Sequence, residues 1–154
     1  MIKEKTQQNT NDKCKDGGLY IPLSKVDGEK INTMLNIALI DLESIKEFEK
    51  IAEKNSGKWN IIYKTYYDIL HQLSEAYMLF DKIKARTHEC LFCYICDNHK
   101  ELELDWNFFE KIRTKRNGTT YYGQILTYKD FKDIDIQIKL YINTIKKAIE
   151  EKLK

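Results

Sequence analysis

The sequence predicts an all-α protein, built as an antiparallel up-and-down bundle of four to five helices. Several long segments carry apolar side chains every three or four residues, which is the spacing of a helix with one buried face. Among the 154 residues there are only six glycines and one proline, so few positions interrupt a helix. Apolar residues make up 42% of the chain, enough for one core that needs neither metals nor disulfides.

The charge balance and the lack of long apolar runs limit the function classes. The chain has 26 basic and 24 acidic residues, a formal charge of +2, so nucleic-acid binding would need a local basic patch. No apolar run approaches the roughly 20 residues of a membrane helix, and the N-terminus lacks the apolar stretch of a signal peptide. We therefore expect a cytoplasmic protein that does not enter the membrane and whose four cysteines are reduced thiols.

The chain divides into a short arm and one domain. Residues 1–18 are polar and end at Gly17-Gly18, which predicts a flexible N-terminal arm with an exposed Cys14. Residues 19–154 form a single helical-bundle domain, which begins with an extended lead-in. Helices are predicted over residues 29–54, 59–84, 86–96 and 106–116, with Asn117-Gly118 as the stop of the fourth, and from a capping box at 127–130 to residue 153.

The last helix has a competing interpretation. Apolar residues alternate strictly from Ile134 to Ile142, which is a strand signal. However, Ile138, Tyr141 and Ile145 continue a helical stripe into strong helix formers. Because no other segment offers a convincing partner strand, we predict a helix.

A basic segment over residues 111–123 contains the strongest functional signal. Arg113 and Arg116 lie three residues apart, so one helix face presents both guanidinium groups. Such a pair can hold a phosphate by bidentate bonds, and Tyr121 and Tyr122 can stack on a base. The alternative is an ordinary basic last turn, favourable to the helix dipole, with tyrosines packed on the bundle.

This segment resembles the signature of HEPN domains, which place an arginine, often followed by asparagine, four to six residues before a histidine. Arg116-Asn117-x-x-x-Tyr121 is similar to that pattern, with a tyrosine at the histidine position. The resemblance covers roughly residues 31–152. It includes two motifs that look like the family's second and third helices, Tyr67-x-x-Leu70-x-x-x-Ser74-Glu75-Ala76 and Thr87-His88-Glu89.

The resemblance implies a four- or five-helix bundle that forms a homodimer, with two arginine motifs facing one cleft and no cofactor. Family members include metal-independent ribonucleases, often toxins of toxin–antitoxin systems, and noncatalytic partners of minimal nucleotidyltransferases. By this resemblance Arg116 and Tyr121 stand at the catalytic positions. Arg113, Asn117 and Tyr122 are the further candidate ligand-binding residues.

Tyr121 argues against efficient catalysis. A tyrosine has an ordinary pKa of about 10, whereas acid–base catalysis works best near the working pH. The motif places neither His71, His88 nor His99 as a substitute, and we interpret His88 as a packing or hydrogen-bonding residue. We therefore expect a module that binds a nucleotide, RNA or a partner protein. The alternatives are a metal-independent endoribonuclease and a purely structural bundle.

Three cysteines, in the pattern Cys90-x-x-Cys93-x-x-Cys96, form a second cluster between His88 and His99. Cysteine and histidine are zinc ligands, but complete zinc patterns have a second pair across a longer loop. On a helix these sulfurs would spread over about 300° at 100° per residue. We therefore favour core packing over a metal site.

Overall fold

The computed structural model describes residues 5–154, apart from the side chain of Thr120. Its helices are joined by short loops, and its only sheet within those residues has two strands. The elements are α1 (Gln7–Asp16), β1 (Tyr20–Pro22), α2 (Gly28–Ile51), α3 (Lys58–Met78), β2 (Ile83–Ala85), α4 (His88–Asn98), α5 (Trp106–Tyr122) and α6 (Tyr128–Leu153), with single 3-10 turns at Leu79–Asp81 and Lys100–Leu102. The all-α class is therefore confirmed.

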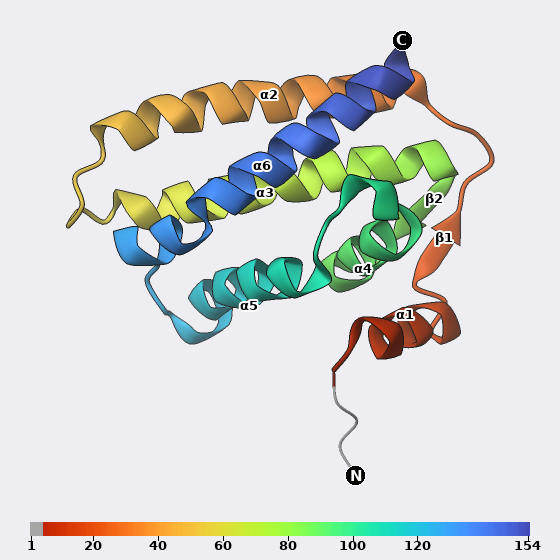
Figure 1. The fold of residues 1–154 in the computed structure, drawn as a ribbon, viewed down its shortest axis with the longest axis horizontal. Coiled ribbons are helices and arrows are strands. Elements are labelled where there is room, and N and C mark those ends of the chain that lie inside the picture. The colour runs from red at the N-terminus through yellow and green to blue at the C-terminus, as the bar shows by residue number, and fades with distance from the viewer. Residues whose placement is uncertain (1–4) are drawn as a thin grey trace.

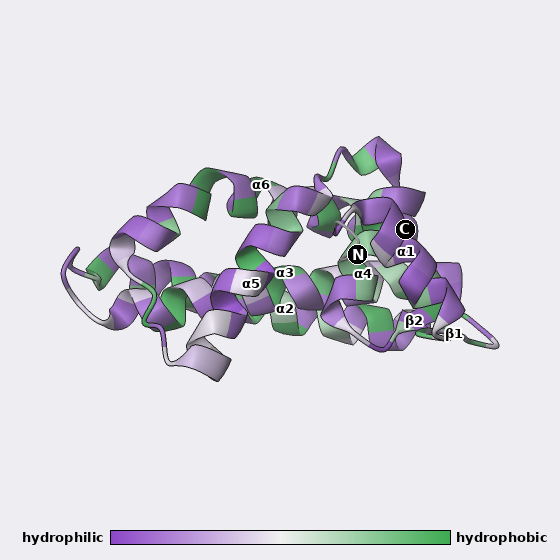
Figure 2. Cartoon of the chain, turned by 90° about the horizontal axis from the view of Figure 1, so that it is seen from below, coloured by the Kyte–Doolittle hydropathy of each residue, from purple (hydrophilic) through white to green (hydrophobic). Residues whose placement is uncertain are grey.

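Helix α3 is the centre of the molecule. It packs against α2 and α6 on one side and against α4 and α5 on the other (Figure 1). Twelve of its 21 residues are buried, among them Tyr63, Tyr66 and Tyr67. The long helices carry hydrophilic and hydrophobic stretches in alternation (Figure 2), as amphipathic helices around one core must. Nothing within residues 5–154 has the length and apolarity of a membrane-crossing helix.

Helix α6 confirms the helical interpretation of the alternating isoleucines. Ile134, Ile138 and Ile142 are buried, whereas Ile136 is 85% exposed. The predicted capping box is present, because the side chains and backbones of Thr127 and Asp130 bond each other reciprocally. Ile136 therefore points to solvent. The buried isoleucines are four residues apart, as they are on one face of a helix.

The second predicted helix ends earlier than expected. Helix α3 stops at Met78, and the left-handed backbone of Lys82 turns the chain into β2. The apolar period runs past this end because Leu79 and Ile83 still pack on the core. Strand β2 pairs antiparallel with β1, which lies in the predicted extended lead-in, in the register Tyr20↔Ala85 and Pro22↔Ile83. This short sheet was not predicted, because β2 lies where one helix was predicted to end and the next to start.

The predicted flexible arm is wrong over α1; residues 1–4 of it lie outside the described residues. Thr6 caps α1 by accepting a hydrogen bond from the backbone N–H of Asn9. Thr10, Asn11 and Cys14 are buried against α4. Cys14 forms a disulfide with Cys90, so the predictions of an exposed Cys14 and of reduced thiols fail for this pair. A short polar helix is only marginally stable by itself, so α1 owes its stability to tertiary docking.

The fourth predicted helix is longer than the sequence indicates. Helix α5 continues through Asn117-Gly118 to Tyr122, and the left-handed glycine that ends it is Gly123, with φ of 65°. A Cβ at Gly118 would lie 2.6 Å from Oε1 of Gln124, the mobile end of a side chain that follows the helix. The remaining cysteines, Cys93 and Cys96, are free thiols buried in the core, as predicted.

Candidate functional site

A cavity of about 400 Å³ lies where α4, α5 and the N-terminal segment meet. We call it the Arg116 cavity. It contains four of the five candidate site residues, while Tyr122 lies outside its lining and is 81% exposed. Its lining residues are Lys13, Leu19, Thr87, His88, Glu89, Cys90, Arg113, Arg116, Asn117 and Tyr121.

The unbroken helix α5 brings the candidate residues together. Arg116 and Asn117 follow Arg113 by three and four residues, and Tyr121 follows Asn117 by four. One helix face therefore carries all four side chains to the cavity. Had the helix ended at Gly118, Tyr121 would not have continued this face.

Arg116 has unused hydrogen-bonding capacity. Its guanidinium lies over the ring of Tyr67, 5.5 Å from the centroid. Its Nη2 donates to Oδ1 of Asp68 at 3.4 Å, a long contact to a side chain that is 57% exposed. Its Nε is buried and has no hydrogen-bond partner within the described residues. Because a buried, unsatisfied donor is costly, this guanidinium is suited to an incoming anion.

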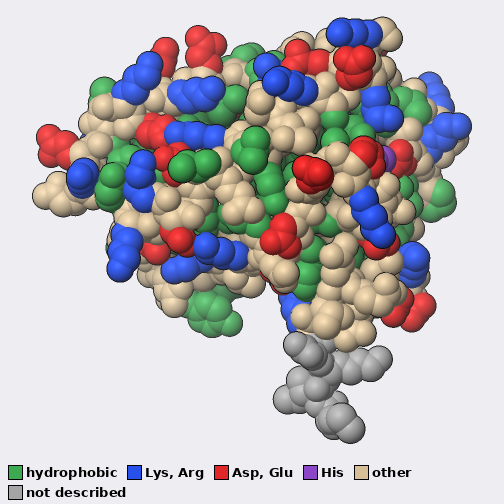
Figure 3. Space-filling model, viewed as in Figure 1, with side chains coloured by type: hydrophobic (Ala, Val, Ile, Leu, Met, Phe, Trp, Pro, Cys, Tyr) green, Lys and Arg blue, Asp and Glu red, His purple; other side chains and the backbone are tan. Residues whose placement is uncertain are grey.

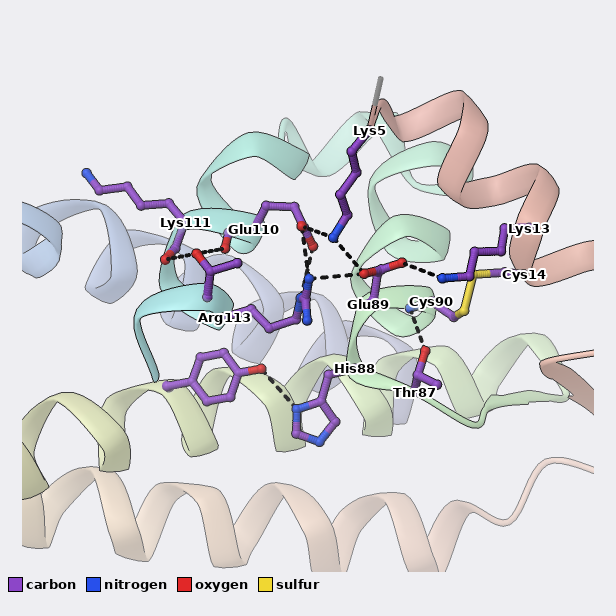
Figure 4. A network of polar contacts seen from close by, with 12 residues as sticks. Lys5, Lys13, Cys14, Thr87, His88, Glu89, Cys90, Glu110, Lys111 and Arg113 are labelled. Atoms are coloured by element: carbon purple, nitrogen blue, oxygen red, sulfur yellow. Dashed lines mark hydrogen bonds and ion pairs between the residues drawn. A yellow bond between two sulfur atoms is a disulfide. The ribbon is translucent and has the colours of Figure 1, made fainter. Parts of the chain in front are cut away.

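Arg113, in contrast, is already neutralised by carboxylates (Figure 4). Its Nη2 lies 3.0 Å from Glu89, and its Nε lies 3.0 Å from Glu110. Lys5 reaches the same two carboxylates at 2.8 and 2.7 Å. Burial opposes the ionisation of Glu110, but hydrogen bonds from Arg113 and Lys5 hold its pKa below the ordinary value. The cavity therefore presents Arg116 as its available guanidinium, rather than an arginine pair.

His88 is a member of the site that the sequence did not identify. It starts α4, and its Nδ1 shares a hydrogen bond of 2.9 Å with the hydroxyl of Tyr67. The predicted packing role is present, since its ring stacks on His71 at 3.7 Å between centroids. Burial, followed by the charge of Arg116, lowers the pKa of His88. The imidazole in the cavity is therefore neutral at pH 7.

His71 lies behind His88, in an adjoining hollow of about 210 Å³. Burial, helped by His88 and Arg116, lowers the pKa of His71 to about 3. His99 is elsewhere: its two ring nitrogens contact Asp81 at 2.6 Å and Glu101 at 3.0 Å. From the sequence, Thr87 as a helix cap could have predicted that His88 lies in the first turn of a helix. The packing of α3, α4 and α5, which the sequence does not show, brings His88 to Arg116.

The exposed edge of the cavity is aromatic and apolar. The side chain of Tyr121 is 74% exposed although it lines the cavity, and Tyr122 and Ile125 are exposed beside it along the chain. Elsewhere, cationic and anionic side chains are interspersed over the face shown in Figure 3, without a broad field of one sign. A ligand would thus be recognised by a local set of groups rather than by net charge.

Among residues 5–154, no group of three or more histidine, cysteine or carboxylate side chains is arranged to hold a metal ion. Cys90 is committed to the disulfide, while Cys93 donates its thiol hydrogen bond to the carbonyl of Gln7. The three cysteines therefore serve a cross-link and the core.

No family model, curated protein or solved structure matches the chain. The chemistry of the Arg116 cavity is consequently argued from its own residues.

Proposed function

We propose that this chain is a nucleotide- or RNA-binding module that holds a phosphate group at Arg116, without efficient catalysis. The observation that carries the proposal is the guanidinium of Arg116 in the lining of a cavity, where it has one long bond to Asp68 and an Nε without a hydrogen-bond partner within the described residues. Its planar donors match phosphate oxygens bidentately. A cavity of about 400 Å³ is within the range of small-molecule sites.

The neighbours of Arg116 suit a nucleotide better than an isolated phosphate. Tyr121 presents an exposed ring at the edge of the cavity, where a base can stack. Asn117 lies on the same helix face and offers both a donor and an acceptor. Phosphate in the cavity and a base over Tyr121 would place a single-stranded segment along the end of α5.

The fold and assembly follow from the same proposal. We propose that the helices form a HEPN-like up-and-down bundle and that the protein works as a homodimer with its two Arg116 cavities facing one cleft. The exposed apolar side chains Tyr122 and Ile125, next to the cavity edge, support a contact surface there. A minimal nucleotidyltransferase is the partner class that the HEPN resemblance suggests.

Binding of a fluorescein-labelled ten-nucleotide single-stranded RNA, followed by fluorescence anisotropy, tests this function. Arg116→Ala should weaken binding about 10- to 150-fold, the equivalent of the 1.5–3 kcal/mol of a charge-assisted bond. Lys111→Ala is the matched control. It removes one charge from the same helix, at a residue that pairs with Asp133 and does not line the cavity. Equal loss in both variants, or no binding by the parent, would refute the proposal and leave a structural bundle.

A ribonuclease is the second candidate, because His88 places a neutral imidazole in the same cavity as Arg116. In such a reaction the Nε2 of His88 would take the proton of a ribose 2′-hydroxyl, and the oxygen would attack the adjacent phosphorus. The bond from phosphorus to the 5′ oxygen would break, and that oxygen would take a proton from water. The products would be a 2′,3′-cyclic phosphate and a 5′-hydroxyl.

Cleavage and binding can be separated experimentally. If the chain is a ribonuclease, His88→Gln should abolish cleavage of labelled RNA while anisotropy still reports binding. His99→Gln is the control, since that histidine pairs with Asp81 and Glu101 away from the cavity. Parent protein that binds RNA but leaves it intact would exclude this candidate and favour the noncatalytic module.

A further inference from the structure

The N-terminal segment forms part of the wall of the Arg116 cavity. Lys13 on α1 and Leu19 just after it line the cavity together with Cys90 of α4. The disulfide between Cys14 and Cys90 lies at this junction, and Figure 4 shows it beside Lys13 and Glu89. The same covalent link therefore fixes α1 and completes the cavity wall.

Apart from this link, polar contacts hold the N-terminal segment to the bundle, among them the ion pairs of Lys5 with Glu89 and Glu110. The Asn11 amide donates to Asp97 at 3.2 Å, and the Cys93 thiol donates to the backbone of Gln7 at 3.3 Å. Lys13 lies 3.9 Å from Glu89, and its side chain is 74% exposed. A ten-residue helix with a polar composition is marginal by itself, so its docking depends on the cross-link together with these contacts.

Docking of α1 also sets the sign of the charge at the cavity. The residues joined by ion pairs at or beside the cavity include four cations and three carboxylates, a formal excess of one positive charge. Two of those cations, Lys5 and Lys13, come from the N-terminal segment. Without them the excess is one negative charge, which repels a phosphate. The full set is Lys5, Lys13, Asp68, Glu89, Glu110, Arg113 and Arg116.

We propose that the Cys14–Cys90 disulfide is a redox control of the anion site, which binds when oxidised and releases when reduced. The inference rests on the proposed phosphate binding at Arg116. A dithiol reduces the bridge by two exchanges: its first thiolate forms a mixed disulfide with one cysteine, and its second displaces that cysteine. The protein gains two thiols and the reductant becomes a cyclic disulfide. Helix α1 then leaves, taking Lys5 and Lys13 with it.

The burial of the bridge adds a second consequence. Cys14 is 0% and Cys90 2% exposed, so a reductant reaches the sulfurs only when α1 opens. A ligand that contacts Lys13 favours the docked helix. Because reduction proceeds through the open state, bound RNA that favours the docked helix lowers the population of that state. Reduction is slowed in the same proportion when opening and closing are faster than the exchange with thiols.

The experiment measures binding of the same labelled RNA by oxidised protein, by protein reduced with dithiothreitol, and by Cys14→Ser. Circular dichroism checks that the bundle remains folded. Loss of one phosphate contact with single-stranded nucleic acid lowers the slope of log K against log salt by about 0.7, or about fivefold in affinity at 0.1 M salt. Reduction and Cys14→Ser should therefore each weaken binding by at least about fivefold, and dithiothreitol should not change Cys14→Ser further.

Two lysine variants of the oxidised protein isolate the charge effect. Lys13→Ala should reproduce the change of about 0.7 in salt slope. Lys15→Ala removes the same charge from the same helix, away from the cavity lining, and should leave the slope unchanged. RNA bound to the oxidised parent should also delay its reduction, measured by the appearance of free thiols.

The outcomes separate the two proposals. Oxidised protein that binds no RNA refutes phosphate binding itself. Oxidised and reduced forms that bind RNA equally well refute the redox control while phosphate binding stands. An equal effect of Lys13→Ala and Lys15→Ala shows that the helix acts through general charge, which also overturns the proposed role of α1 in the cavity.

Discussion

Removing the Cys14–Cys90 bridge should lower the free energy of unfolding by several kcal/mol. The two cysteines are 76 residues apart, and the chain-entropy relation for a loop of that length gives about 4.5 kcal/mol at 25 °C. Domains of this kind are stable by about 5–15 kcal/mol, so the bridge would supply a large share of the total. Urea denaturation followed by circular dichroism, on oxidised parent and Cys14→Ala, measures the difference.

A double-mutant cycle distinguishes the cross-link from ordinary packing. Cys14→Ala and Cys90→Ala each break the same bridge, so combining them should cost little more than one alone, with a coupling energy of about 4.5 kcal/mol. Cys93→Ala is the control, because it removes a buried thiol of α4 that is not cross-linked, and should cost about 1 kcal/mol. Additive losses for Cys14 and Cys90 would refute the cross-link as the source of stability.

Three further predictions concern single side chains. The pKa of His71, about 3 when folded, lies below the ordinary value of about 6.5, so the unfolded chain binds more protons in acid. The contribution of His71 to the free energy of unfolding is complete above pH 6.5 and falls by up to about 1.4 kcal/mol per pH unit as the pH drops toward 3. Between pH 7.5 and 5, the free energy of unfolding measured with urea should therefore change less for His71→Gln than for the parent. An equal change in the two proteins would contradict the burial argument. Thr127→Ala should cost about 1 kcal/mol through loss of the capping box, whereas Lys129→Ala should be nearly neutral in the same denaturation assay. Tyr121→His adds an imidazole at the cavity edge and should raise the rate of metal-free RNA cleavage by at most about 100-fold, since this position is 74% exposed. The gain should vanish when Arg116→Ala is added. A gain that survives Arg116→Ala would show that the cavity is not the site of cleavage.

The long helices could be predicted because local and tertiary signals agree in them. In α6 the apolar stripe, the capping box and the helix-forming composition all indicate the same element. In α2 the stripe and the composition do so, although the helix ends at Ile51, before the predicted stop at residue 54. Even the alternating isoleucines of α6 were resolved correctly, because a strand would have needed a partner. The end of α3 was misplaced for the opposite reason: its apolar period continues into residues that pack on the core without being helical.

The sequence predicted only those residues of the candidate site that lie on helix α5. Arg113, Arg116, Asn117 and Tyr121 share a face of α5, and helical spacing alone brings them together. The sequence placed a helix stop at Gly118, yet the glycine there is not left-handed, and Gly123 ends the helix instead. An asparagine–glycine pair ends a helix only when the glycine adopts the left-handed conformation, and that choice depends on the contacts around it.

The parts of the site that the sequence missed all come from other elements. His88 reaches Arg116 because α3, α4 and α5 pack together, and its nearest sequence motif describes only a helix start. Lys13 joins the cavity because a disulfide holds a short polar helix that composition alone describes as a tail. In both cases the residue acts through contacts with segments far along the chain. The locally encoded component of this site is the face of α5 that carries Arg116, and the charge and proton chemistry of the site are set by tertiary neighbours. That division predicts which substitutions matter: changes on α5 should alter ligand contact directly. A change at His88 should alter cleavage of the bound ligand, and a change at Cys14 should alter its affinity. Arg116 itself stays in place in both variants.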